Sequence, residues 1–197
     1  MGLELKPSKT SIAHTLESYE GKKPGFHFLG FHTQQFHTGK YHSKQGFKTV
    51  TKPSKEKIHA HYKDIAKVIE ESKSASQKVL INRLNPIIRG WANYYSTVVS
   101  KEIFSKLDLL IFLKLWSWAK KRHHNKGKKW IVRKYWHSYK GDNWVFSTNS
   151  DEAGVKLFKH SKTPIVRFTK VKQKASPFDG NLKYWATRKG KSPELPT

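Results

Sequence analysis

The chain has 197 residues, a length that suits one domain of ordinary size or two small ones. Its 39 Lys and Arg residues outnumber its 14 Asp and Glu, giving a formal net charge of +25 and a pI near 10.1. This charge predicts a nucleic-acid partner bound through its phosphates, with a merely basic surface or anionic lipid as alternatives. The absence of cysteine excludes disulfides, Cys-ligated zinc and a thiol nucleophile. No apolar run reaches the length of a membrane span, and no signal-peptide core is present.

The first fifty residues predict short extended elements. Residues 25–31 place aromatic side chains at alternating positions, which is typical of a strand, and residues 41–50 are expected to return as its hairpin partner. Before them, Ser8 is placed to cap a brief helix carrying Ile12 and Leu16.

Helical spacing dominates the middle of the chain. A helix is expected from Ser54, which is placed as its N-cap in the same way as Ser8, with Ile58, Tyr62, Ile65, Val68 and Ile69 on its apolar face. A second is expected to begin at Pro86, with Asn85 as its N-cap, and to run to about Val98. Ser100 is the expected cap of a third, whose stripe is Phe104, Leu107, Ile111, Leu115 and Trp118. A short helix or turn is expected at residues 129–136.

Beyond Gly141 the periodicity changes to two. Residues 144–148, 155–159 and 165–171 predict three strands of a small sheet, and the Pro-containing tail after Ser176 is expected to be extended. The predicted fold class is α+β: a helical bundle with a short N-terminal β-hairpin and a small C-terminal antiparallel sheet. The expected divisions are residues 1–52, 53–140, 141–175 and 176–197.

Four segments, in order, resemble the C-terminal part of group II intron reverse transcriptases and maturases. They are residues 2–10 (GLELKPSKT), 28–31 (FLGF), 84–95 (LNPIIRGWANYY) and 176–179 (SPFD). The resemblance implies the end of a palm, a thumb and a maturase domain, without fingers, most of the palm or the His-Asn-His nuclease. The family's paired polymerase aspartates have no counterpart, because no two Asp residues are adjacent. A split gene, a degenerate remnant and a fragment all remain possible.

Two groups of side chains are candidates for RNA contact. On a helix from Pro86, Arg89 and Asn93 lie opposite the apolar face formed by Ile87, Ile88, Trp91 and Tyr95. The second group is the basic stretch at residues 120–129, which continues to residue 134. We expect it to contact RNA phosphates, although a charge run is often only the solvated face of a helix. The candidate residues are Arg89, Asn93, Lys101, Lys106, Lys120, Lys121, Arg122, Lys126, Lys128, Lys129, Arg133 and Lys134.

No metal, cofactor or catalytic site is expected in this chain. His59 and His61 lie on different helix faces, and the adjacent His123 and His124 cannot easily share one ion. No nucleophile–base motif or Gly-rich phosphate loop occurs. By the resemblance, Mg²⁺ would belong to the ribozyme or to a separate palm, and enzymatic activity, which in the parent family is RNA-directed DNA synthesis, stays open.

By resemblance, the expected function is to bind group II intron RNA and assist its splicing by stabilising the active ribozyme fold. The alternative is the thumb-bearing half of a split reverse transcriptase that acts with a separately encoded palm. A generic basic RNA chaperone is a third possibility. The expected location is the cytoplasm, or the equivalent organellar matrix, without a membrane partner.

Overall fold

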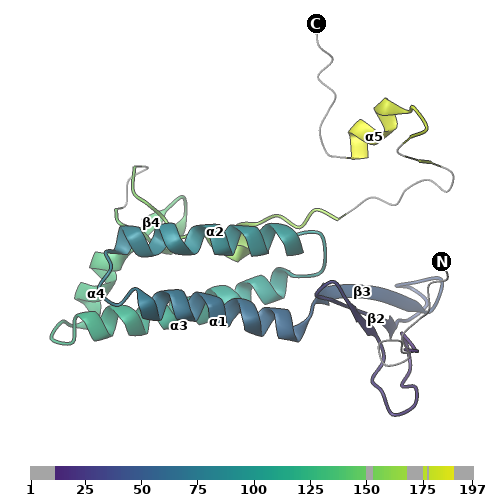
Figure 1. Ribbon diagram of the computed structural model, residues 1–197, viewed down its shortest axis with the longest axis horizontal. Coiled ribbons are helices and arrows are strands. Elements are labelled where there is room, and N and C mark those ends of the chain that lie inside the picture. The colour runs from purple at the N-terminus through teal and green to yellow at the C-terminus, as the bar shows by residue number, and fades with distance from the viewer. Residues whose placement is uncertain (1–11, 150–152, 168–174, 177, 189–197) are drawn as a thin grey trace, which may run out of the picture. The chain divides into compact units, whose positions relative to one another are not determined.

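The computed structural model describes residues 12–149, 153–167, 175–176 and 178–188. The chain divides into two compact units, residues 1–165 and residues 166–197. The first unit contains an N-terminal sheet, helices α1 to α4 and a second, smaller sheet (Figure 1). The predicted α+β class is therefore confirmed.

The N-terminal sheet has three antiparallel strands: β1 (Phe26–Phe28), β2 (Phe31–His37) and β3 (Phe47–Pro53). The single strand predicted over residues 25–31 is wrong, because Leu29 and Gly30 turn the chain with φ angles of +48° and +83°. A Cβ on Gly30 would also lie 2.9 Å from the Tyr95 hydroxyl, so this turn needs glycine. Residues 12–25 contain no helix, and Ser8 lies outside the described residues.

Three long helices form the body of the first unit: α1 (Lys55–Glu71), α2 (Gln77–Tyr95) and α3 (Lys101–Arg122). Ser54 caps α1 as predicted, since its hydroxyl accepts a hydrogen bond from the Lys57 amide. Arg83 reaches back to Glu71, so α2 runs antiparallel to α1. In contrast, Trp118 donates to the carbonyl of Ser72, at the end of α1, so α3 runs parallel to α1 (Figure 1).

The helix start predicted at Pro86 is wrong. Helix α2 is continuous from Gln77 to Tyr95 with Pro86 inside it, and Ser76 is its N-cap. Proline in a helix interior costs about 3 kcal/mol. This cost is offset because the helix buries one uninterrupted apolar face on both sides of the proline: Leu80, Ile81, Leu84, Ile88, Ala92 and Tyr95.

Helix α3 begins where predicted, but Ser100 does not cap it with its side chain. The hydroxyl of Ser100 donates instead to the carbonyl of Tyr95, at 2.7 Å, and ties the end of α2 to the start of α3. The predicted stripe is confirmed, since all of its members are buried: Phe104, Leu107, Ile111, Leu115 and Trp118. This stripe packs against α1, α2 and the smaller sheet.

The smaller sheet pairs different residues from those predicted. Helix α4 (Lys128–Tyr135) is followed directly by β4 (Trp136–Tyr139), which pairs with β5 (Asp142–Phe146). Of residues 155–159, only Lys156 forms a bridge, to Ser147. Residues 165–167 are not in a strand, and residues 168–171 lie outside the described part of the chain.

The second unit contains one described helix, α5 (Leu182–Arg188), so the prediction of an extended tail is wrong there. Asp179 accepts hydrogen bonds from the Asn181 amide, at 2.9 Å, and from the Trp185 indole, at 3.1 Å. These contacts organise the start of the helix. Among the described residues, no helix has the length and hydrophobicity needed to cross a membrane.

Candidate nucleic-acid interface

Helix α3 separates the predicted RNA-binding residues into two groups. A helix of 22 residues is roughly 30 Å long. Four of the residues lie where α2 ends and α3 begins, and we call them the N-terminal group: Arg89, Asn93, Lys101 and Lys106. The other eight lie where α3 ends and α4 follows, at the end of the bundle away from β2 and β3 (Figure 1). We call this second group the tip: Lys120, Lys121, Arg122, Lys126, Lys128, Lys129, Arg133 and Lys134.

Three cations of the N-terminal group contact other parts of the protein. The Lys101 ammonium donates to the carbonyls of Ser161 and Thr163. Lys106 pairs with Glu102 one turn away, at 3.0 Å. The Arg89 guanidinium lies over the Phe158 ring, 5.3 Å from its centroid, although Arg89 and Asn93 are both exposed.

At the tip, Arg122 also has a structural role. Its guanidinium donates to the backbone carbonyls of Lys73, Ser74 and Ala75, which form the loop between α1 and α2. It also lies over the Trp118 ring, 5.2 Å from the centroid. The other seven tip cations are exposed to solvent: Lys120, Lys121, Lys126, Lys128, Lys129, Arg133 and Lys134.

A hollow of about 260 Å³ lies between the end of α1 and α3, and cations dominate its lining. Lys73, Lys114, Lys121 and Arg122 line it together with Glu70. Lys114 pairs with Glu70, and this hydrogen bond lowers the pKa of the Glu70 carboxyl. Lys73 and Lys114 were absent from the predicted interface. The spacing of Lys114 and Lys121, seven residues or two helical turns, could have placed them on one face.

The tip also holds an exposed aromatic side chain, Trp130 on α4. The ammonium groups of Lys134 and Lys126 lie 4.8 and 5.6 Å from its ring centroid. The edge of the His123 ring contacts it at a centroid separation of 4.8 Å. Trp130 was absent from the predicted interface, because an isolated Trp in a basic run gives no indication of which way it faces.

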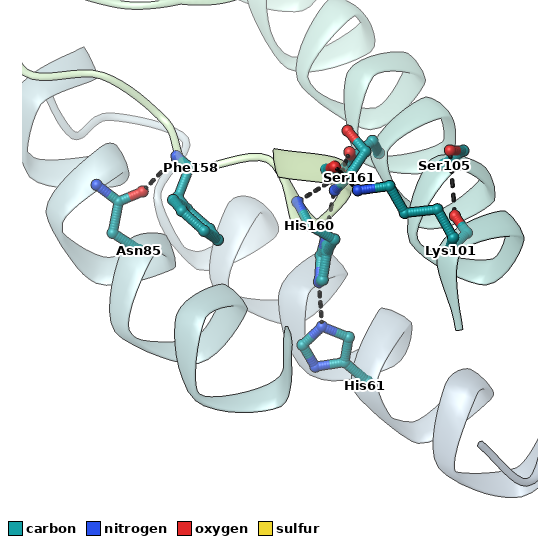
Figure 2. A network of polar contacts seen from close by, with 8 residues as sticks. His61, Asn85, Lys101, Ser105, Phe158, His160 and Ser161 are labelled. Carbon is teal, nitrogen blue, oxygen red and sulfur yellow. Dashed lines mark hydrogen bonds and ion pairs between the residues drawn. The ribbon is translucent and has the colours of Figure 1, made fainter. Parts of the chain in front are cut away.

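A buried polar network joins α1 and α3 to the segment after β5 (Figure 2). Nε2 of His61 lies 2.9 Å from Nε2 of His160, and Nδ1 of His160 lies 2.9 Å from Asp108 Oδ1. Asp108 also accepts hydrogen bonds from the backbone amides of His160 and Ser161, at 2.8 and 2.9 Å. The His61 ring stacks on Trp91 with a centroid separation of 4.5 Å. These contacts fix residues 160–161 against the helices.

The protonation states of this network follow from its burial. Burial, together with the charge of His160, lowers the pKa of His61 to about 3, so His61 is neutral near neutral pH. Burial opposes ionisation of Asp108, but hydrogen bonds from His160 and Ser161 outweigh it and lower the pKa of this carboxyl. No nucleophilic side chain takes part in these contacts, and His160 is fully buried. The network therefore has the properties of a structural clasp.

Asn85 contributes a second attachment for the same segment. Its side-chain amide donates to the Lys156 carbonyl at 2.9 Å, and its side-chain oxygen accepts from the Phe158 amide at 2.8 Å (Figure 2). The predicted N-cap residue is thus used to bind another part of the chain. Within the described residues, no group of three His, Asp or Glu side chains is arranged to hold a metal ion.

Comparison with known proteins finds a match over the helical part of the chain. Residues 58–136 match the family model "Group II intron, maturase-specific domain". The chain is also similar to the ribosomal operon-associated A protein of Euglena longa, with 29% identity over 114 residues that cover 57% of this chain. The matched region is 22% of that relative, so this chain corresponds to about a fifth of its length. The segment that matches this family model comprises most of α1 and all of α2, α3 and α4.

Proposed function

We propose that this chain binds group II intron RNA and assists its splicing by stabilising the folded ribozyme. The observation that carries the proposal is the tip, where seven exposed cations gather at one end of the segment that matches the maturase-specific domain. Each cation that neutralises a phosphate releases counterions, so binding through the tip is strongly salt-dependent. Phosphate contacts of this kind position the protein on the RNA and do not read its sequence.

The proposed assistance is thermodynamic. A protein shifts the folding equilibrium of an RNA only by binding the folded state more tightly than the unfolded state. The placement of most tip cations on α3 or α4 supports such a preference, because the two helices fix the spacing of the backbone positions that carry them. The RNA and its Mg²⁺ carry out the splicing reaction in this proposal. The reaction takes place wherever the transcript is, in a bacterial cytoplasm or an organellar matrix.

The test is splicing of the cognate intron at a Mg²⁺ concentration too low for efficient self-splicing. We expect the chain to restore splicing, and the double substitution Lys120→Ala/Lys121→Ala to reduce this effect. The matched control is Lys52→Ala/Lys106→Ala, which removes the same charge from two lysines, on β3 and α3, that both act on Glu102 near the start of α3. This control should retain activity. No gain in splicing with the wild-type chain, or equal affinity for the intron and an unrelated RNA of the same length, would refute the proposal.

A second candidate function is that of the thumb-bearing half of a split reverse transcriptase. The exposed apolar side chains of the N-terminal sheet favour it, since Phe28 is 65% exposed and Leu29 is 70% exposed at the turn between β1 and β2. A separately encoded palm would cover this surface. The test is co-purification, and primer extension, with a Tyr-X-Asp-Asp polypeptide encoded beside this chain. Phe28→Ser/Leu29→Ser should abolish the association, and association that survives this change would refute the assigned surface.

A further inference from the structure

Trp130 differs from Trp118, the buried tryptophan near the end of α3, in what surrounds it. Trp118 is 6% exposed, and its indole N–H donates to the Ser72 carbonyl at 3.0 Å. Trp130 is 38% exposed. Within the part of the chain that the structure describes, its indole N–H makes no hydrogen bond, and its ring is flanked by Lys126 and Lys134. A large ring held among cations at a solvent-exposed end contributes less to a core than a buried one.

The ring is held in place from within the protein. His123 contacts the Trp130 ring edge-on, with an interplanar angle of 68°. His123 is itself fixed, because its Nε2 lies 2.7 Å from the hydroxyl of Tyr135, which is 3% exposed. Partial burial and the charges of Lys134, Arg122 and Lys126 lower the pKa of His123, so this bracing ring is neutral near neutral pH. An aromatic side chain supported in this way loses little conformational entropy when a ligand stacks on it.

Both parts of a single-stranded nucleotide find a partner at this site. An indole face suits any base, and ammonium groups within reach of the same ring suit the phosphates on either side. In the free protein, Lys134 and Lys126 interact with the ring face as cations. When a base stacks on the ring, these ammonium groups can move from the ring to the flanking phosphates. Each ammonium group therefore has an interaction partner in both the free and the bound protein.

We propose that Trp130 is a stacking platform for an unpaired base of the bound RNA, with Lys126 and Lys134 on the adjacent phosphates. The inference rests on the proposed RNA binding and adds to it the kind of RNA that the tip prefers, namely a loop, bulge or strand end. In duplex RNA the bases are already stacked on one another, so this contact distinguishes single-stranded from double-stranded RNA.

The experiment measures the affinity of the full chain for an oligouridine of about 12 nucleotides and for an RNA duplex of similar length. We expect Trp130→Ala to weaken oligouridine binding roughly tenfold, and Trp130→Phe to retain most of the affinity. The dependence of log affinity on log salt should not change, since no cation is removed. Duplex binding should stay at the wild-type level. The matched control is Trp144→Ala, because Trp144 is 49% exposed on β5.

Tryptophan fluorescence gives a readout that a purely structural role would not change. Saturating oligouridine should quench the emission of the wild-type chain, and Trp130→Phe should remove this quenching while Trp144→Phe retains it. Wild-type oligouridine affinity in Trp130→Ala, or an equal loss for oligouridine and duplex, would overturn the proposal. The oligouridine measurement requires no intron, so a chain that fails the splicing test would refute the proposed function and leave this result standing.

Discussion

The two ends of helix α3 use charge differently. At its start, Lys101 donates to two backbone carbonyls, and Asp108, two turns further on, accepts hydrogen bonds from His160 and Ser161. At its end, Lys120 and Lys121 point to solvent, and α4 adds more exposed cations. The same helix therefore fixes a neighbouring segment with one end and presents a positive surface with the other.

The comparison shows why a net charge of +25 does not by itself locate an interface. A cation that already interacts with a carbonyl or carboxylate must give up that partner before it binds a phosphate. Two of the three cations in the N-terminal group, Lys101 and Lys106, are such side chains, whereas most of the tip cations are not. Arg122 is the exception at the tip, because it closes the loop between α1 and α2.

The largest expected effect is on stability, at the start of α3. Asp108→Ala removes the acceptor of three hydrogen bonds in the clasp, so we expect the free energy of unfolding to fall by about 3 kcal/mol. Urea denaturation measures this change, with Asp64→Ala, an exposed change on α1, as the control. RNA affinity of the folded variant should remain at the wild-type level. If Asp108→Ala instead leaves stability unchanged and weakens RNA binding, the start of α3 would be the RNA-binding end, contrary to the roles assigned here.

The second effect is a dependence of stability on pH. His61 has a pKa of about 3 in the folded protein, below its ordinary value of 6.5, so the unfolded chain binds more protons between these values. Stability should therefore fall as the pH is lowered below 6.5, by up to about 1.4 kcal/mol per pH unit. His61→Gln should flatten this slope in urea titrations between roughly pH 6.5 and 4.5. An unchanged slope would show that His61 is not the responsible group.

The third prediction separates two neighbouring cations at the tip. Arg122→Ala should lower the free energy of unfolding by about 1–2 kcal/mol, because the loop carbonyls lose their donor. Lys120→Ala should leave stability unchanged and reduce the slope of log RNA affinity against log salt by roughly 0.7–0.9. Thermal unfolding and filter binding over a salt series measure the two quantities. The opposite assignment, with Lys120 affecting stability, would break the comparison.

The smallest expected effect concerns the N-terminal group. Lys101→Ala should lower the free energy of unfolding by about 1 kcal/mol, since Lys101 is exposed but bonded to two carbonyls. Lys106→Ala removes only an exposed pair with Glu102 and should have no measurable effect on stability. Neither change should alter intron affinity at moderate salt. A tenfold loss in either variant would extend the RNA interface to this end of the helix.

Much of the helical fold could be predicted from the sequence, because apolar spacing and caps are local signals. The stripe of α3 and the Ser54 cap are examples. The break expected at Pro86 was wrong because the cost of proline is local, whereas the burial that offsets it comes from α1 and α3. The strand after α4 was missed for a similar reason, since Trp136 joins a sheet only through its pairing with Phe146.

The candidate site was less predictable than the fold. Residue type identified cations, but whether Lys101 or Arg122 has a protein partner depends on segments 60 and 49 positions away. The clasp has the same character, since His61 and His160 are 99 residues apart. Trp130 could not be distinguished from a core tryptophan by its neighbours in the chain.

The most direct test of the central claim is to ask which end of α3 touches the folded intron RNA. Benzoylphenylalanine can be placed at Lys129, on the tip, or at Lys106, near the start of α3, and each variant irradiated with the intron folded in Mg²⁺. We predict strong crosslinking from residue 129 and little from residue 106, at equal occupancy. Equal yields from both positions, or a higher yield from residue 106, would contradict the assignment of RNA binding to the tip.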